Sequence, residues 1–155
     1  CIAREVSGPF GVGRGGPGGW VILVEPELHL SGHVLVPDLA GWRRDRVSTP
    51  PAGVLINDIP DWICEIVSPS NASHDTITKM EDYHRAAVGH YWLLDPRDET
   101  LEVYRYTVDG YLRVLGATRG QSVRAEIAPG SPGVAGRILP LRAACSGSDA
   151  SCALR

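Results

Sequence analysis

Two carboxylates lie within apolar stretches of this sequence, where a charged side chain is costly to bury unless a partner compensates it. Asp38 lies in VLVPDLA and Glu65 lies in WICEIVS. Because side chains alternate between the two faces of a strand, we expect Asp38 to share an apolar face with Val34 and Val36. If the two stretches are neighbouring strands, the like charges repel, and a bound divalent cation relieves that repulsion. The pair is therefore a candidate site for a divalent cation.

An alternative interpretation of these carboxylates needs no metal. Each one could cap a loop or pair with an arginine such as Arg43 or Arg44. Together with Arg46, these arginines form a short basic cluster after the Asp38 stretch. Such clusters contact phosphates in DNA-binding proteins, and they also occur on solvated loops. The residues alone leave both interpretations open.

Lys79 and Tyr83 follow Glu65 on a predicted helix, where their spacing of four residues places them on one face. A lysine beside a metal-bound water can orient that water or stabilise charge on a phosphoryl group in the transition state. A single helix lysine is ordinarily only solvated. Lys79 is therefore informative as a member of a set with Asp38 and Glu65.

The elements that must position these residues are short strands and one helix. The patterns predict strands at 20–30, 32–42, 62–68 and 91–95, a hairpin of 101–106 and 111–117, and a helix from Thr76 or Thr78 to about Ala87. We expect Ser31-Gly32 and Asp109-Gly110 to form turns, and Gly89 to stop the helix. Strands mixed with a helix favour an α+β fold over an all-β sandwich.

Composition limits the classes of protein that the chain can belong to. Its 155 residues, 43% of them hydrophobic, fit one domain, and a net charge of −3 gives no overall attraction to nucleic acid. No apolar run approaches the roughly 20 residues of a membrane span, so we expect no membrane association. Four cysteines without a CxxC pair indicate a reduced, cytoplasmic protein.

Three segments are expected along the chain. Residues 1–19 form a glycine-rich loop or fragment end, residues 20–127 form the domain, and residues 128–155 form a poorly ordered tail. Because residue 1 is Cys and not Met, we expect the chain to be a fragment.

Four sequence blocks, in this order and spacing, carry a resemblance to a known family. They are VPDLA at 36–40, CEIVSPS at 64–70, Asp75 with Lys79 and Tyr83, and GHYWLLDP at 89–96. Over roughly residues 16–127, the sequence resembles the Uma family of restriction-endonuclease-like proteins, which belongs to the PD-(D/E)XK nuclease superfamily.

The resemblance implies a restriction-endonuclease-like fold, with a mixed central β-sheet and a flanking helix. It also implies an endonuclease that hydrolyses DNA phosphodiester bonds with Mg²⁺ or Mn²⁺. In that case Pro37-Asp38 is the PD element, Glu65 is the second acid, and both carboxylates hold the metal. The usual third-position lysine would fall at Val67, and Lys79 on the following helix matches its replacement. Asp95 matches a further family acid, although a strand end before Pro96 also suits a turn residue.

The resemblance also implies that Asp38, Glu65 and Lys79 are the catalytic residues, with further residues around them and with binding partners. Pro37, Tyr83, Arg43 and Arg44 would support the site or contact substrate. DNA is the expected partner, and a second copy of the chain is a candidate partner.

The sequence departs from the family pattern in three places. The family's N-terminal helix is largely absent, its last strand is not recognisable after residue 128, and Val67 breaks the strict motif. The rival interpretation is a degenerate nuclease fold that binds nucleic acid or a protein. Convergence of Asp38, Glu65 and Lys79 within about 8 Å would favour the enzyme, because metal–oxygen bonds are only about 2.0–2.6 Å long.

Overall fold

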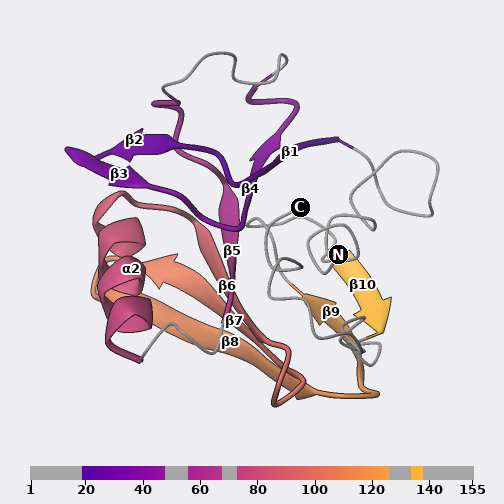
Figure 1. Cartoon of the computed structure of the whole chain (residues 1–155). Helices are drawn as coiled ribbons and strands as arrows, with labels where there is room; N and C mark the ends of the chain where they lie inside the picture. Colours follow the sequence, from indigo (N-terminus) through magenta and orange to yellow (C-terminus); the bar gives the residue numbers. More distant parts are fainter. Residues whose placement is uncertain (1–18, 48–55, 68–72, 126–133, 138–155) are drawn as a thin grey trace, which may run out of the picture.

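The computed structural model describes residues 19–47, 56–67, 73–125 and 134–137. Its centre is a six-stranded mixed sheet with the strand order β1-β4-β5-β6-β7-β8 (Figure 1). The strands are β1 (Trp20–Val24), β4 (Leu39–Arg43), β5 (Trp62–Ile66), β6 (His90–Asp95), β7 (Thr100–Thr107) and β8 (Gly110–Thr118). Within this sheet, β5 and β6 are the parallel pair, and helix α2 (Ser73–Arg85) makes the crossover that a parallel pair requires. This mixed sheet with its flanking helix confirms the predicted α+β class.

Two short ribbons complete the described fold. β2 (Leu28–Leu30) pairs with β3 (His33–Leu35), and β9 (Ser122–Ala125) pairs with β10 (Val134–Arg137). The β2–β3 ribbon lies on the same side of the sheet as α2, and β9–β10 lies on the other side (Figure 1). The predicted Ser31-Gly32 turn is present, and both residues have positive φ, as a type I′ hairpin turn requires.

The two long strands predicted at 20–30 and 32–42 are each divided in two. Pro26 separates β1 from β2, and Pro37 separates β3 from β4, because proline has no N–H for the ladder. Asp38 therefore lies in a bend just before β4, and its predicted place on an apolar strand face is wrong. Val34 and Val36, the predicted neighbours on that face, are 57% and 47% exposed.

Helix α2 begins at Ser73, earlier than predicted, and ends at Arg85. Its C-terminal cap is Ala87, which has a φ of 57° and donates its N–H to His84 O at 2.9 Å. Val88 N–H bonds Tyr83 O at 3.1 Å, which completes a Schellman motif. The prediction that Gly89 stops the helix is wrong by two residues.

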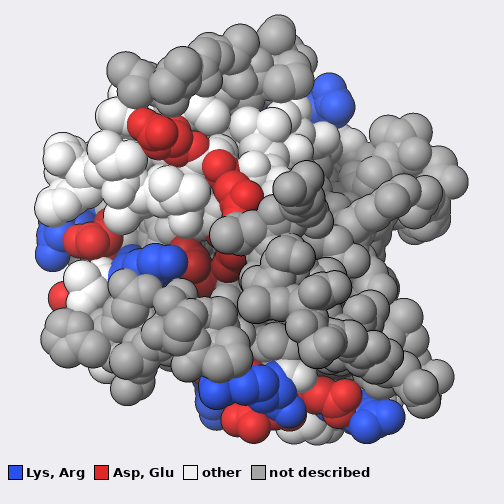
Figure 2. Space-filling model, in the orientation of Figure 1, with Lys and Arg blue, Asp and Glu red and all other residues white. Residues whose placement is uncertain are grey.

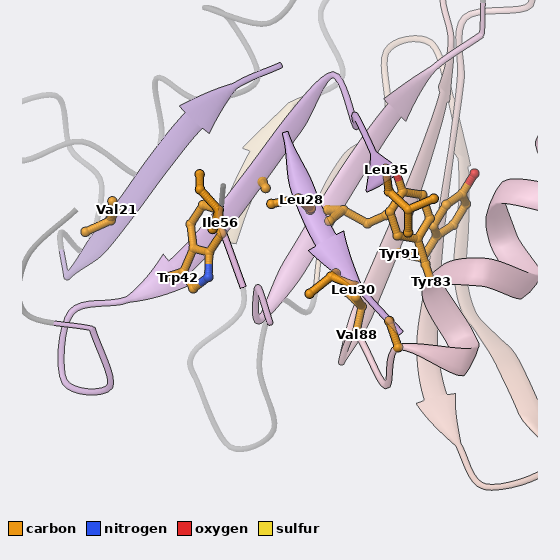
Figure 3. Close-up of a cluster of buried hydrophobic side chains, with 12 residues drawn as sticks. Val21, Leu28, Leu30, Leu35, Trp42, Ile56, Tyr83, Val88 and Tyr91 are labelled. Atoms are coloured by element: carbon orange, nitrogen blue, oxygen red, sulfur yellow. The ribbon is translucent and has the colours of Figure 1, made fainter. Parts of the chain in front are cut away.

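The sheet carries a separate hydrophobic cluster on each face. Along β5, Trp62 and Cys64 point to one face while Ile63 and Glu65 point to the other, where α2 and the β2–β3 ribbon pack. The cluster on the α2 face is drawn in Figure 3 and includes Leu28, Leu30, Leu35, Ile63, Tyr83, Val88 and Tyr91. Cys64 is a buried free thiol and packs as a small apolar side chain, as predicted. Glu65 is thus a carboxylate on an otherwise apolar, helix-covered face.

Part of the predicted segmentation lies outside the described residues. Of segment 1–19 only Gly19 is described, and of segment 128–155 only β10 is described. The division into three segments therefore stays a prediction. Among the described helices, none has the length and apolar character needed to cross a bilayer.

Candidate active site

Glu65 is held at the end of β5 by two side chains from α2. It is only 7% exposed, its Oε2 accepts a hydrogen bond from Lys79 Nζ at 2.9 Å, and its Oε1 accepts one from Tyr83 Oη at 2.7 Å. Lys79 and Tyr83 lie one helical turn apart, so a single face of α2 supplies both donors. The structure therefore brings together three residues that the sequence singled out.

Asp38 reaches the same end of β5 from the bend before β4. Its Oδ2 accepts a hydrogen bond from the Ile66 backbone N–H at 2.6 Å. β4 and β5 are antiparallel, with Leu39 opposite Cys64, so the Asp38 bend continues that register toward Glu65. The charge of Asp38 also acts on Glu65, where it contributes to a raised pKa. Asp38, Glu65 and Lys79 thus lie at one end of β5, while their role as one metal-binding set stays a prediction.

Opposing influences set the charge of Glu65. Burial raises its pKa most strongly, the hydrogen bond and charge of Lys79 and the hydrogen bond of Tyr83 lower it, and the charge of Asp38 raises it. The net direction is upward from the ordinary glutamate value. Burial and the nearby Glu65 charge also raise the pKa of Tyr83, so its hydroxyl stays protonated and donates to Glu65.

Of the two arginines expected near the site, Arg43 pairs with another residue and Arg44 is exposed to solvent. The Arg43 guanidinium pairs with Asp45, with Nε 3.0 Å from Oδ1, and its backbone N–H bonds Asp61 Oδ2 at 2.8 Å. The Arg44 side chain is exposed. The ion-pair partner that the structure gives Glu65 is Lys79 and not an arginine, and Arg43 pairs with Asp45 instead.

Asp95 organises a turn. Its Oδ1 accepts hydrogen bonds from the backbone N–H groups of Arg97 at 2.8 Å and Asp98 at 3.3 Å, and the Arg97 guanidinium adds an ion pair. The Arg97 hydrogen bond lowers the pKa of Asp95. These contacts match the turn interpretation of this residue.

The donor chemistry of Asp38 and Glu65 suits a hard divalent cation. An ionised carboxylate has about four lone-pair positions, and each described partner takes one of them, so both groups keep capacity for a metal. Among the described residues no set of three or more His, Cys, Asp and Glu side chains is placed to bind a metal. Mg²⁺ is commonly held by one or two carboxylates, with waters and substrate phosphates completing its shell. The pair therefore fits Mg²⁺ or Mn²⁺ as an open site.

One residue at this site was not predicted from the sequence. Tyr91 lies on β6, and it lines a small pocket together with Glu65, Lys79 and Thr76. The parallel register places Tyr91 beside Ile63, on the same sheet face as Glu65. That face could have been inferred from the sequence only if the parallel β5–β6 pairing had been known.

The surface around these elements carries mixed charge. On the face shown in Figure 2, acidic and basic side chains lie near one another, and the described atoms form no continuous basic surface. This distribution agrees with the net charge of −3.

A family model named Uma2, with the description "Putative restriction endonuclease", matches residues 11–136. Among solved structures, the chain is similar to a protein of Anabaena variabilis ATCC 29413 whose structure is titled a "putative nuclease belonging to DUF820". The TM-score is 0.58 at 18% identity, over 81% of this chain and 66% of the Anabaena chain. A comparison with curated proteins gives no match.

The family match extends over most of the chain and includes Asp38, Glu65, Lys79 and Tyr83. The structural match supports the restriction-endonuclease-like fold that the sequence blocks predicted. This chain spans just under two thirds of the length of the Anabaena protein. The chain belongs to the Uma2 family of restriction-endonuclease-like proteins.

Proposed function

We propose that this protein hydrolyses DNA phosphodiester bonds, with Mg²⁺ or Mn²⁺ held by Asp38 and Glu65. The observation that carries the proposal is the buried Glu65 carboxylate, which bonds Lys79 at 2.9 Å and lies beside the Asp38 bend. A structural ion pair alone would need no second carboxylate at the same strand end. Membership of a restriction-endonuclease-like family supports the same reaction class.

The two carboxylates would bind the metal in different ways. Asp38 is oriented by the Ile66 N–H, whereas Glu65 is oriented by Tyr83 and Lys79. When bound, the divalent cation supplies positive charge for phosphate oxygens and acidifies a coordinated water. The buried Pro37 fixes the backbone just before Asp38, which supports its placement.

Lys79 would act on the phosphate. Its side chain is 29% exposed, so the ammonium is accessible while Glu65 holds it in place. A phosphate oxygen that approaches the carboxylate pair would meet this ammonium, which can donate a hydrogen bond as negative charge develops. The chemistry would thus need no lysine at position 67, where Val67 stands.

Cleavage of supercoiled plasmid DNA with Mg²⁺ or Mn²⁺ tests this proposal. We expect the wild-type chain to nick the plasmid, and Lys79→Ala to lower kcat by roughly 10²- to 10³-fold, as loss of one charge-stabilising donor does. Arg85→Ala is the matched control, because Arg85 lies on the same helix but is exposed and pairs with Asp82. Circular dichroism of each variant checks that α2 is intact.

Two results would refute the proposal. One is a folded wild-type chain that leaves DNA uncut with either metal, and the other is a Lys79→Ala variant that cuts as fast as wild type. DNA binding without cleavage would favour the rival interpretation, a degenerate nuclease fold that serves as a binding module.

A further inference from the structure

Tyr91 is a fully buried tyrosine whose hydroxyl has no hydrogen-bond partner among the described residues. Three other tyrosines on this face of the sheet do have partners. Tyr83 bonds Glu65 at 2.7 Å, Tyr104 bonds Glu102 at 2.5 Å, and Tyr111 bonds the Val88 carbonyl at 2.8 Å. Buried tyrosine hydroxyls nearly always find a partner, because leaving a buried donor unpaired is unfavourable. We therefore expect the Tyr91 hydroxyl to have a hydrogen-bond partner that is not part of the described chain.

The surroundings of Tyr91 indicate what that partner is. Tyr91 lines a pocket with Glu65, Thr76 and Lys79, whose volume of about 10 Å³ is close to the minimum for one water molecule. Such a pocket is too small for an organic ligand. Its polar lining supplies hydrogen-bond partners, which a buried water requires.

The aromatic packing holds Tyr91 in place. Its ring lies 6.0 Å from the Tyr83 ring and 6.0 Å from the Tyr104 ring, and Figure 3 shows Tyr83 and Tyr91 beside each other between the sheet and α2. Burial and the charge of Glu65 raise the pKa of Tyr91, so the hydroxyl keeps its proton and can donate a hydrogen bond. A fixed, protonated donor at the edge of a charged pair is suited to hold a water in a defined orientation.

We propose that Tyr91 is a positioning residue, whose hydroxyl donates a hydrogen bond to one water molecule shared with Glu65 and Lys79. Each hydrogen bond of this water has a matching donor and acceptor. It accepts from Tyr91 Oη–H and from the Lys79 ammonium, and it donates to the Glu65 carboxylate, with Thr76 available as a further acceptor. The water thereby fixes the ammonium relative to the carboxylate. Its effect on catalysis rests on the proposed function, whereas its presence does not.

The test compares Tyr91→Phe with wild type and with Tyr104→Phe. Tyr104→Phe is the matched control, because it removes the hydroxyl of a neighbouring ring that bonds Glu102, and neither Tyr104 nor Glu102 lines the pocket. A high-resolution crystal structure of each protein shows whether the pocket holds a water, thermal unfolding gives Tm, and DNA cleavage gives kcat and KM.

We expect a water within hydrogen-bond distance of Tyr91 Oη and a Glu65 oxygen in the wild type, and none in Tyr91→Phe. The variant should lose about 10- to 100-fold in kcat, as removal of outer-shell partners typically does, with KM for DNA and Tm close to wild type. Tyr104→Phe should keep both the water and kcat. A lower kcat with an unchanged Tm indicates a positioning role. A merely structural role would instead lower Tm and leave kcat per folded molecule unchanged.

The inference is overturned if the wild-type pocket holds no water on Tyr91, or if Tyr91→Phe keeps the wild-type kcat. Absence of cleavage by the wild type with any metal refutes the proposed function instead. In that case the crystallographic water decides the inference by itself, because a water bonded to Tyr91 and Glu65 supports it and a dry pocket refutes it.

Discussion

Glu65 is placed where burial makes its charge unfavourable for folding. Its raised pKa means that the folded chain holds the Glu65 proton more tightly than the unfolded chain does. Below the ordinary value of 4.5 both states are protonated, and this residue adds no pH dependence. As the pH rises above 4.5, the unfolded state loses its proton first, so the contribution of Glu65 to the free energy of unfolding declines. The decline ends once the folded carboxyl has also ionised.

A Glu65→Gln variant should remove that decline. We expect its Tm to equal or exceed that of wild type at pH 8, and the difference between the two proteins to shrink as the pH falls toward 4.5. Glutamine keeps an oxygen that can accept from Lys79 or Tyr83, so the packing is retained. Thermal unfolding of both proteins across this pH range checks the prediction. A variant that loses stability at pH 8 and regains it on acidification would contradict the sign.

At the scale of single residues, the sequence predicted which charged and polar groups interact, but it did not predict all of their hydrogen-bond partners and neighbours. The carboxylate within WICEIVS and the spacing of Lys79 and Tyr83 were sufficient, because strand and helix periodicities are local properties. The partners of Arg43 were not predictable, since Asp61 reaches it from across a loop. Tyr91 was missed for a related reason, because its neighbour Glu65 lies on a different strand.

At the scale of elements, a close approach of two strands positions the site. Gly41 on β4 lies against the Trp62 ring of β5, and a Cβ at Gly41 would lie 2.3 Å from Trp62 Nε1. Trp62 is fully buried and cannot swing away into solvent. The same strand pair brings Asp38 to the Ile66 N–H, so the glycine allows the pairing on which the carboxylate pair depends.

Gly41→Ala should therefore destabilise the protein by about 1–3 kcal/mol, the usual cost of overpacking a core. It should also weaken metal binding, because a shifted β4 moves Asp38. Gly116→Ala is the matched control, since Gly116 lies on β8 and its nearest contact from an added Cβ would be 3.7 Å. Urea unfolding of both variants measures the difference. Equal stability of the two variants would show that the strands do not depend on this contact.

The elements were predicted best where turn chemistry is local. The hairpin of β7 and β8 forms across Val108 and Asp109 as expected, because Asp-Gly favours a tight hairpin turn. The breaks at Pro26 and Pro37 follow from the missing N–H of proline. They were not predicted, because the alternating apolar residues on both sides of each proline indicated one continuous strand. Ala87 as the helix cap was not predictable, since alanine rarely adopts positive φ and tertiary packing decided the position.

At the scale of the whole molecule, a net charge of −3 works against DNA binding in the absence of a metal. Arg43 and Arg46 are paired with Asp45 and Asp61, so these two arginines add little to the attraction. A cation at the carboxylate pair would reverse the local charge at the position where the proposed function requires a phosphate. The fold class was predictable from the sequence, whereas this charge balance depends on which partners meet in three dimensions.

DNA affinity should therefore depend on a divalent cation. Fluorescence anisotropy of a labelled duplex is expected to show at least about tenfold tighter binding in Ca²⁺ than in EDTA at constant ionic strength. The Asp38→Asn variant should lose that difference. Tight binding in EDTA would instead indicate a surface that binds DNA without metal.

Calorimetric titration of Mn²⁺ into the apo protein tests for a metal site at Asp38 and Glu65, and it requires neither a DNA sequence nor turnover. We expect one binding event in the wild type that is weakened at least about tenfold by Asp38→Asn or Glu65→Gln. Asparagine at 38 can still accept the Ile66 N–H, so the variant isolates the charge. Asp98→Asn, on the exposed turn after β6, should bind Mn²⁺ as wild type does. A folded wild type without binding heat, or an Asp38→Asn variant with unchanged affinity, would contradict a metal site at this pair.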